Sequence, residues 1–334
     1  MFYQGQKILF APLNWGLGHA SRSIPLIQKA LNVGSVVYIA SDGAALDLLK
    51  RELPSCTFIN LPAYDIRYKY TSIFLNIFVQ LPRILITYIH EKQRVSNIVD
   101  TYNIDLIVSD NRFGAWSNTC TSIYITHQLS IFHTSKWISK VATLCHQWVM
   151  KPFDEIWVPD IAGDQSFAGL LSKNSSINSD RVKYLGPITR LKIGHKYKGG
   201  KNILVMLSGP EPQRTSLENK LIDILQPISQ DILFIRGAQK PTPLKLQKLY
   251  EYIDLANSVQ IEEAIAAATL IICRSGYSTV MDLSIFDKKI IYIPTPGQTE
   301  QEYLADYHGF HNEQVTSIVQ KALESDLLKV VMKG

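Results

Sequence analysis

Short apolar segments alternate with amphipathic ones along the chain, and this alternation predicts the folding class. In the first half, apolar runs such as KILFAPL, SVVYIAS and IDLIVSD are bounded by polar residues and have the length of buried strands. Between them, apolar residues recur at helical spacing over residues 20–31 and 44–52. Strands that alternate with helices build a parallel sheet with helices on its faces. Further strands are expected at CTFINLP, SIYITHQ and EIWVPD.

The second half of the chain repeats this alternation. Its predicted strands are NILVMLS, DILFIRG, SVQI, TLIICRS and KIIYIPT, and its predicted helices cover residues 215–225, 244–253, 262–268, 278–286 and 314–331. Between the halves, LKIGHKYKGGK at residues 191–201 is basic, contains glycine and lacks periodicity. We therefore predict two Rossmann-like, doubly wound α/β domains, residues 1–190 and 202–334. Residues 191–201 would link them, and the final helix could return to the first domain.

Composition agrees with this organisation and excludes several classes of protein. The 334 residues exceed the size at which a single hydrophobic core stops growing. The net charge of +5 comes from dispersed basic residues, so we expect no nucleic-acid partner. The four cysteines form no CxxC pair, which argues against a disulfide framework and a zinc site. The N-terminal MFYQGQKILFAP has no secretory pattern, and we expect a cytoplasmic protein.

Residues 64–94 differ from the rest because Tyr, Arg and Lys flank a strongly apolar middle. Polar residues and a proline interrupt the apolar runs, which are therefore too short to span a bilayer. Four apolar residues would share one helical face: Ile73, Phe74, Ile77 and Phe78. Four basic residues accompany them: Arg67, Lys69, Arg83 and Arg94. Such a stripe is typical of a core helix. It could also form an acceptor-side surface for a lipid-linked or apolar substrate, with peripheral contact to the inner face of the membrane.

Loops that follow parallel strands hold the ligands of doubly wound domains. The loop NWGLGHASR follows KILFAPL and opens a helix, and Gly16 and Gly18 would allow a tight turn and close approach of a ligand. His19 could accept a proton near neutral pH, or it could simply cap or pack beside the loop. Gly16, Gly18 and Ser21, with Asp42 further on, imitate a dinucleotide-binding fingerprint, but the third glycine is missing.

The loop SDNRFG follows IDLIVSD, whose end should lie beside the first loop. Asp110 could orient and charge-stabilise His19 or contact an acceptor. It could equally form a turn or cap a helix. His127, after SIYITHQ, is a lesser candidate at a similar strand end.

Two loops in the second half suit a nucleotide diphosphate. After NILVMLS, backbone donors at Ser208 and Gly209 and the guanidinium of Arg214 could approach a diphosphate, and Thr215 with Glu218 indicates a capping box. The more specific pattern is CRSGYSTVMDL followed by IPTPGQTEQE. It would open a helix with phosphate-binding amides and hydroxyls, place a carboxylate against two ribose hydroxyls, and offer two side chains to sugar hydroxyls. The residues concerned are Arg274, Ser275, Gly276, Ser278, Thr279, Asp282, Glu300 and Gln301.

These motifs resemble those of the family 28 glycosyltransferases, the group of the N-acetylglucosaminyltransferase of peptidoglycan precursor synthesis, and of UDP-glucuronosyltransferase-like enzymes. CRSGYSTVMDL is similar to the family's Arg-x-Gly-x-x-Thr-x-x-Glu-Leu block, with Asp282 where the family has a ribose-binding Glu. TEQEYLA is similar to the block that ends in Gln-x-x-x-Ala and contacts the donor sugar. The family's Gly-Gly-Ser-x-Gly loop is replaced here by Ser208-Gly209-Pro210-Glu211-Pro212.

The resemblance implies a GT-B fold, two Rossmann-like domains facing across a cleft, with the acceptor on the first and a UDP-sugar on the second. NWGLGHASR resembles the family's N-terminal glycine loop. In related plant and animal enzymes, a histidine at this position acts as the base and has an aspartate partner. This implies those roles for His19 and Asp110.

The implied reaction is a single inverting displacement without a metal or other cofactor, in which helix N-termini and Arg214 or Arg274 stabilise the leaving diphosphate. Two alternatives stay open: a nucleotide-sugar 2-epimerase, and a non-catalytic nucleotide-sugar-binding subunit that would not need His19.

Overall fold

The computed structural model describes residues 2–15, 17–66, 73–173, 177–193, 203–209, 211–226, 231–238 and 241–308. The chain divides into two compact units. Unit 1 contains Met1–Arg190 and Pro296–Glu300, and unit 2 contains Leu191–Thr295 and Gln301–Gly334. Most of the predicted linker, from residue 194 onward, and the predicted helix 314–331 lie outside the described residues.

Unit 1 is built on a parallel sheet of seven strands in the order β3-β2-β1-β4-β5-β6-β7. The strands are β1 (Lys7–Pro12), β2 (Val36–Ser41), β3 (Thr57–Asn60), β4 (Leu106–Asp110), β5 (Thr121–Ile125), β6 (Glu155–Val158) and β7 (Val182–Tyr184). The strand order reverses direction between β1 and β4, where Pro12 lies opposite Asp110. Ligands of doubly wound sheets bind at such a switch point, outside the carboxyl ends of the strands.

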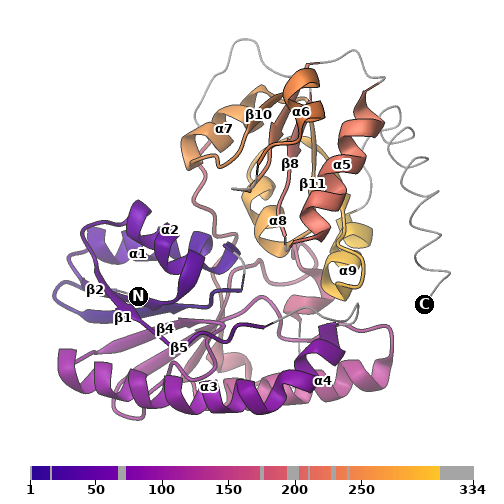
Figure 1. Ribbon diagram of the computed structural model, residues 1–334. Helices are drawn as coiled ribbons and strands as arrows, with labels where there is room; N and C mark the ends of the chain where they lie inside the picture. Colours follow the sequence, from indigo (N-terminus) through magenta and orange to yellow (C-terminus); the bar gives the residue numbers. More distant parts are fainter. Residues whose placement is uncertain are drawn as a thin grey trace. The chain divides into compact units, whose positions relative to one another are not determined.

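Helices cover both faces of this sheet, as the alternation of side chains along β1 requires. The helices of unit 1 are α1 (Gly18–Asn32), α2 (Gly43–Glu52), α3 (Ile73–Tyr102) and α4 (Lys136–Met150). Ile8 and Phe10 pack in the core beneath α1 and α2, whereas Leu9 and Ala11 pack against α3 on the opposite face (Figure 1). Both faces of the central strands are therefore buried, which explains their nearly continuous apolar sequences.

Unit 2 has a parallel sheet of five strands in the order β10-β9-β8-β11-β12. The strands are β8 (Ile203–Met206), β9 (Ile232–Ile235), β10 (Glu251–Ile253), β11 (Leu270–Arg274) and β12 (Lys289–Ile293). The helices are α5 (Gln213–Leu225), α6 (Leu244–Leu249), α7 (Ser258–Ala267), α8 (Tyr277–Ser284) and α9 (Thr299–His308). Leu217 and Leu221 of α5 and Leu246 of α6 pack on Val205 and Phe234 in one core. The switch point of this sheet lies between β8 and β11. The predicted class of two doubly wound α/β sheets is thus confirmed.

Three local predictions in the second half are wrong. The predicted helix 244–253 ends at Leu249, because residues 251–253 pair with β9 as an edge strand. SVQI is not a strand but the first turn of α7, which Asn257 and Gln260 close with a reciprocal capping box. The expected capping box of Thr215 and Glu218 is absent because α5 already begins at Gln213, and Glu218 instead forms buried ion pairs.

The region singled out at residues 64–94 contains the first 22 of the 30 residues of α3. One face of α3 is buried along Ile84, Thr87, Glu91 and Val95. No helix among the described residues is long and apolar enough to cross a bilayer. The side chains of Ile73, Phe74 and Ile77, and the whole of Arg67 and Lys69, lie outside the described residues.

Candidate active site

The switch point of unit 1 brings together the two residues predicted to handle a proton. His19 lies in the first turn of α1, directly after the β1 loop, and Asp110 is the last residue of β4. Because β1 and β4 are neighbours, the imidazole Nδ1 of His19 lies 2.7 Å from Oδ1 of Asp110. Asp110 is 1% exposed, so its carboxylate is shielded from water. Gly18 opens α1, whereas Gly16 lies outside the described residues.

Arg22 joins this pair, although the sequence analysis gave it no role. It lies three residues after His19, on the same face of α1. Its Nε donates to Oδ2 of Asp110 at 2.6 Å, and its Nη2 contacts Oδ1 of the same carboxylate. The same Nη2 lies 2.8 Å from Nδ1 of His19. One guanidinium therefore touches both members of the predicted pair.

The charges decide the protonation of the group. Burial alone would raise the pKa of Asp110, but Arg22 and His19 outweigh it and lower that pKa to about 2. Burial lowers the pKa of His19 below its usual value, with Arg22 adding to the effect and Asp110 opposing it. At neutral pH, the site thus holds an ionised carboxylate beside a neutral imidazole. If Nδ1 of His19 donates to Asp110, its Nε2 can accept a proton; if Nδ1 accepts from Arg22, the proton sits on Nε2.

His127 extends the network, as its position at the end of β5 allows. Its Nδ1 accepts from Nη1 of Arg22 at 3.3 Å, and its Nε2 then donates to Oε1 of Glu300 at 2.9 Å. Gln128 donates to the other oxygen of Glu300. Thr299 donates to the carbonyl of Phe132 at 3.0 Å. These contacts explain why Pro296–Glu300 groups with unit 1, and they occupy the carboxylate predicted to bind a donor sugar.

Asp42 does not take the ribose-binding place of a dinucleotide fold. Its Oδ1 accepts from Nη2 of Arg112 at 2.5 Å, and its Oδ2 accepts from Asn14 at 2.9 Å. Arg112 is fully buried and also lies 3.0 Å from Glu91. The two oxygens of Asp42 thus connect the loop after β1 with the loop after β4, and the dinucleotide interpretation loses its acidic residue.

In unit 2, the CRSGYSTVMDL motif forms the end of β11 and the start of α8. Gly276 is the N-cap of α8. Ser275 is buried and donates to the carbonyl of Gln301 at 2.7 Å. Ser278, Thr279 and Asp282 remain partly exposed, and their spacing places them on one side of the helix, with the two hydroxyls in its first turn and Asp282 one turn further on. This side of α8 therefore presents two hydroxyls and one carboxylate together.

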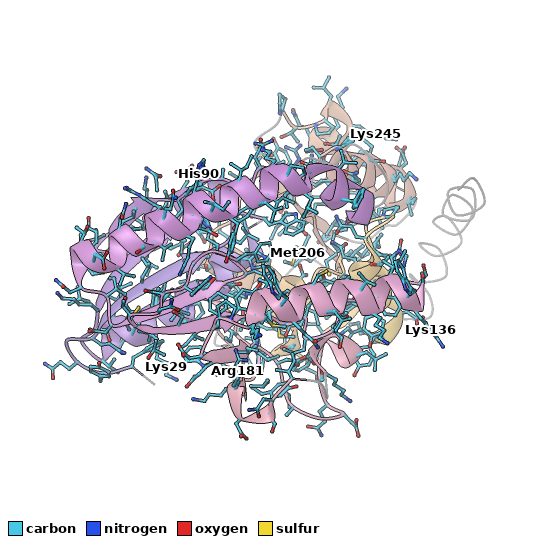
Figure 2. The ribbon with its side chains drawn as sticks, turned by 90° about the horizontal axis from the view of Figure 1, so that it is seen from below. Lys29, His90, Lys136, Arg181, Met206 and Lys245 are labelled. Atoms are coloured by element: carbon cyan, nitrogen blue, oxygen red, sulfur yellow. The ribbon has the colours of Figure 1, made fainter. Side chains whose placement is uncertain are left out.

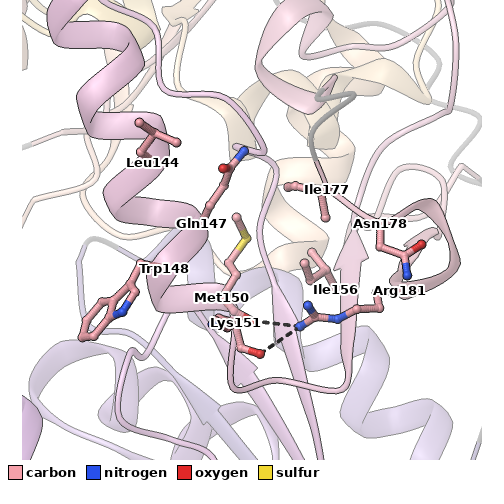
Figure 3. Close-up of a pocket in the computed structure, with 9 residues that line it drawn as sticks. All are labelled: Leu144, Gln147, Trp148, Met150, Lys151, Ile156, Ile177, Asn178 and Arg181. Atoms are coloured by element: carbon pink, nitrogen blue, oxygen red, sulfur yellow. Dashed lines mark hydrogen bonds between the residues drawn. The ribbon is translucent and has the colours of Figure 1, made fainter.

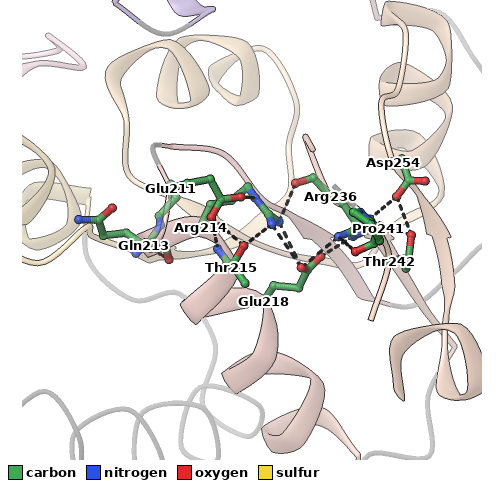
Figure 4. Close-up of polar contacts among 10 residues, drawn as sticks. Glu211, Gln213, Arg214, Thr215, Glu218, Arg236, Pro241, Thr242 and Asp254 are labelled. Carbon is green, nitrogen blue, oxygen red and sulfur yellow. Dashed lines mark hydrogen bonds and ion pairs between the residues drawn. The ribbon is translucent and has the colours of Figure 1, made fainter. Parts of the chain in front are cut away.

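The two arginines predicted to meet a diphosphate are turned into the protein. Nε of Arg214 donates to Glu211 at 2.8 Å, and its Nη1 lies 3.3 Å from buried Glu218, which also binds Arg236 (Figure 4). Arg274 donates to the carbonyls of Pro294 at 2.7 Å and Gln213 at 3.0 Å. An anion would have to compete with these partners. Both side chains instead connect the loops that surround the strand ends.

Several buried polar atoms at this edge of the second sheet have no hydrogen-bond partner among the described residues. They are Nε of Arg274, Oε1 of Gln213 and Oγ1 of Thr295. The exposed loop residue Gly209, at a φ of +102° that favours glycine, lies beside Thr295, since an added Cβ would come within 3.9 Å of its Oγ1. Ser208 is also exposed. Buried polar atoms without partners are uncommon in folded proteins. Thr295 is thus a candidate residue that the sequence analysis missed.

Gln301 supports the same edge from α9. Its Oε1 accepts from the backbone amide of Thr295 at 2.9 Å, and its carbonyl receives the Ser275 hydroxyl. No cluster of three or more His, Cys, Asp or Glu side chains within the described ranges could hold a metal ion.

Comparisons with known proteins now identify the second unit. Residues 213–333 match the family model described as the glycosyltransferase family 28 C-terminal domain. The chain is a glycosyltransferase with a family 28 C-terminal domain. The match begins at Gln213, so the Ser208–Gly209 loop of this glycosyltransferase lies outside the matched region. This agrees with the sequence of that loop, which differs from the family's Gly-Gly-Ser-x-Gly loop. No curated protein matches the sequence.

Solved structures confirm the GT-B fold of the glycosyltransferase. The glycotransferase of kitacinnamycin is 10% identical with a TM-score of 0.66, covering 96% of this chain and 91% of that one. MurG from Acinetobacter baumannii is 10% identical with a TM-score of 0.55, covering 90% and 82%. A Listeria monocytogenes protein assigned as a UDP-N-acetylglucosamine 2-epimerase is 11% identical with a TM-score of 0.56, covering 95% and 88%.

Proposed function

We propose that this glycosyltransferase transfers a sugar from a UDP-sugar to an acceptor hydroxyl with inversion and without a metal. The observation that carries the proposal is the contact between His19 and the buried Asp110 at the switch point of unit 1. A neutral imidazole that an ionised carboxylate orients through Nδ1 is suited to general base catalysis. The family 28 domain in unit 2 supports donor binding there.

In the proposed reaction, Nε2 of His19 takes the proton of the acceptor hydroxyl as its oxygen attacks the anomeric carbon. The bond between that carbon and the diphosphate oxygen breaks, and the diphosphate leaves with the electron pair. Asp110 keeps the imidazole in the required tautomer and stabilises the imidazolium that forms. Arg22 is a positioning residue that holds Asp110 through both carboxylate oxygens.

Unit 2 would bind the nucleotide through the start of α8. Ser278 and Thr279, with the amides at the helix N-terminus, suit phosphate oxygens, and Asp282 suits the ribose hydroxyls. Oε1 of Gln213 and Oγ1 of Thr295, which have no partner within the part of the chain that the structure describes, and the backbone at Ser208 and Gly209 are further donors and acceptors for this ligand. Arg214, Arg274, Ser275 and Gln301 would fix the surrounding loops, since their side chains already have protein partners.

We further propose that the acceptor is lipid-linked or apolar and meets the surface of residues 64–94. Within this segment, Phe78 is 73% exposed and Ile89 is 52% exposed on α3. Arg83 is partly neutralised by an ion pair of 2.7 Å with Asp65. The apolar side chains therefore support this interpretation more than the charges do.

A nucleotide-sugar 2-epimerase is the second candidate, because a protein assigned to that activity shares the fold. A thermal-shift panel of nucleotide sugars would first select the donor, and incubation with the labelled donor would then separate the functions. Transfer or slow hydrolysis supports the transferase, interconversion of two sugars supports the epimerase, and binding without turnover supports a binding subunit. Turnover that EDTA abolishes would refute the metal-free reaction.

A further inference from the structure

Asp110 and Asn111 follow one another at the end of β4, and their side chains serve opposite faces of the unit 1 sheet. Asp110 faces α1, where it contacts His19 and Arg22. Asn111 instead contacts Tyr124 of β5, whose ring packs in the core under α4. The predicted base and the amide of Asn111 therefore lie on the two sides of one strand end, at the switch point where ligands of such sheets bind.

The side chain of Asn111 has a fixed direction because buried groups hold it. The hydroxyl of Tyr124 donates to Oδ1 of Asn111 at 2.7 Å. Burial raises the pKa of Tyr124 well above its usual value, so this hydroxyl keeps its proton. Burial lowers the pKa of His146 to about 4, so its imidazole is neutral and has one N–H. Nε2 of His146 lies 3.3 Å from the phenol oxygen, and it donates there because the hydroxyl proton already serves Asn111.

Helix α4 brings His146 to this position. It lies with α3 on one face of the sheet, and Figure 2 marks its first residue, Lys136. Met150, one turn after His146, packs with Tyr124 in one core. Gln147, next to His146, instead lines a recess of about 310 Å³ at the end of the helix (Figure 3). The two neighbouring residues of α4 therefore have different surroundings, and only His146 contacts the phenol.

The amide nitrogen of Asn111 remains available for a ligand. Its Oδ1 accepts from Tyr124, whereas Nδ2 has no hydrogen-bond partner within the ranges that the structure describes. Asn111 is partly exposed, and its backbone has a φ of +61°, a conformation that Asn adopts more readily than most residues. Such conformations cluster at functional sites, where the surrounding structure maintains them. Here a buried phenol holds the residue from behind and leaves its N–H donors to the open side.

The surroundings of Asn111 are aromatic. Phe113, two residues further on, is partly exposed and packs against Tyr64 with ring centroids 5.6 Å apart. Trp15, in the loop after β1, is also partly exposed and packs in the same cluster. Ligand sites combine apolar and aromatic walls with a small number of fixed polar groups. Aromatic side chains suit the C–H faces of a ring, and the amide suits an oxygen that the ring carries.

We propose that Asn111 binds the acceptor, donating from Nδ2 to a second oxygen that lies one or two carbons from the hydroxyl that His19 activates. Tyr124 and His146 are positioning residues that keep the amide nitrogen turned toward the ligand. The reacting end of the acceptor is then a ring with at least two oxygens, whatever apolar part follows it. This inference rests on the proposed function, because it needs His19 as the base.

The test measures which alcohol receives the sugar from the donor that the thermal-shift panel selects. The probes are cyclohexanol, which has one oxygen, and cyclohexane-1,2-diol and cyclohexane-1,3-diol, which have two. Each alcohol forms its glycoside as the diphosphate leaves. After correction for the number of hydroxyls, we expect the wild type to use at least one diol with a kcat/KM about 2- to 12-fold above that of cyclohexanol, the contribution of one neutral hydrogen bond.

Asn111→Asp should abolish this preference. Asp tolerates the backbone conformation and keeps an oxygen for Tyr124, but an ionised carboxylate has no N–H to donate. The preference is a ratio of two reactions that share one base, so an effect of the new charge on His19 cancels. The ratio therefore reports on the amide nitrogen alone.

Tyr124→Phe tests the positioning role. It keeps the ring that packs on Phe153 and removes only the hydroxyl, so the preference should fall by part of the same factor. Adding Tyr124→Phe to Asn111→Asp should cause no further fall, because both changes break one chain of hydrogen bonds. A merely structural role of Tyr124 predicts equal losses for all the alcohols, and thus an unchanged ratio.

Two matched controls should keep the wild-type preference. Asn118→Asp makes the same chemical change at an exposed residue three positions before β5, at the other edge of the sheet. Gln147→Ala changes the neighbour of His146 that lines the recess. Circular dichroism and melting temperature establish that each variant is folded.

Equal use of cyclohexanol and both diols by the wild type overturns the proposal. So does a preference for a diol that persists in Asn111→Asp, or one that Asn118→Asp abolishes equally. Donor consumption that His19→Ala does not slow would refute the proposed function, and the role of Asn111 with it. The two failures are distinguishable, because consumption that depends on His19 with an unchanged ratio in Asn111→Asp refutes only the role of Asn111.

Discussion

The two switch points of this glycosyltransferase have the same topology but differ in how completely their polar groups are paired. At the ends of β1 and β4, Arg22, Asp110 and His19 satisfy one another. At the ends of β8, β11 and β12, Arg214 and Arg274 turn inward, and atoms of Gln213 and Thr295 have no partner among the described residues. The first arrangement is organised before any substrate binds, as proton transfer requires. The second would be completed by a ligand.

This contrast assigns separable roles to the two units. A change at the unit 1 cluster should alter turnover and its pH dependence while leaving nucleotide affinity intact. A change at the unit 2 edge should alter nucleotide affinity while leaving the pH dependence intact. A variant that shifts both quantities together would break the comparison.

The largest effect is expected for His19→Ala. Loss of a positioned base should lower kcat by about 10² to 10⁴-fold. The fold should persist because Asp110 keeps its contacts with Arg22. Steady-state kinetics with the selected donor give kcat, and calorimetry gives the affinity for UDP, which should match the wild type. A nearly normal kcat would assign His19 to a structural role.

A smaller effect is expected for Asp282→Ala at the unit 2 edge. A charged acceptor of ribose hydroxyls contributes about 1 to 3 kcal/mol, which corresponds to a Kd for UDP raised by about 5- to 150-fold. Asp287→Ala, in the loop after α8, serves as a matched control that should bind UDP normally. If Asp282→Ala keeps wild-type affinity, the ribose is bound elsewhere.

Much of this arrangement follows from the sequence because strand ends are set by local pattern. The apolar runs locate β1 and β4, and their neighbouring positions in a doubly wound sheet place His19 near Asp110. Arg22 was not predicted, because its direction depends on α1 starting at Gly18 rather than at residue 20. The sequence did contain a signal for Arg22, because a residue three positions after His19 lies on the same face of a helix.

Other features depend on distant segments and could not be predicted from local pattern. Arg214 turns inward because it pairs with the buried carboxylate of Glu218. Glu218 also pairs with Arg236, which follows a different strand, β9. Strand β10 forms because its three residues pair with β9, although their own sequence pattern continues that of the preceding helix. The exposure of Trp137 and Trp148 depends on which side of α4 meets the unit, and periodicity alone does not reveal that.

The smallest effect is expected for Arg22, and it tests the unit 1 side of the comparison most sharply. Arg22 lowers the pKa of His19, so its removal in Arg22→Gln should raise that pKa. The base is active only when unprotonated, and the acid limb of kcat/KM should therefore move to higher pH. At neutral pH the loss in kcat/KM should be about tenfold or less, and it should recover as the pH rises.

Arg22→Gln also leaves the carboxylate of Asp110 buried without its cation, which destabilises a fold by about 3 to 5 kcal/mol when such a pair is broken. Arg22→Lys restores the charge and separates the two consequences, because it should return the acid limb toward the wild-type position even if its stability stays below that of the wild type. A purely structural role for Arg22 predicts a uniform loss of activity at every pH in both variants. An acid limb that does not move in Arg22→Gln would therefore remove Arg22 from the control of the base, while an accompanying change in UDP affinity would show that the two switch points do not act separately.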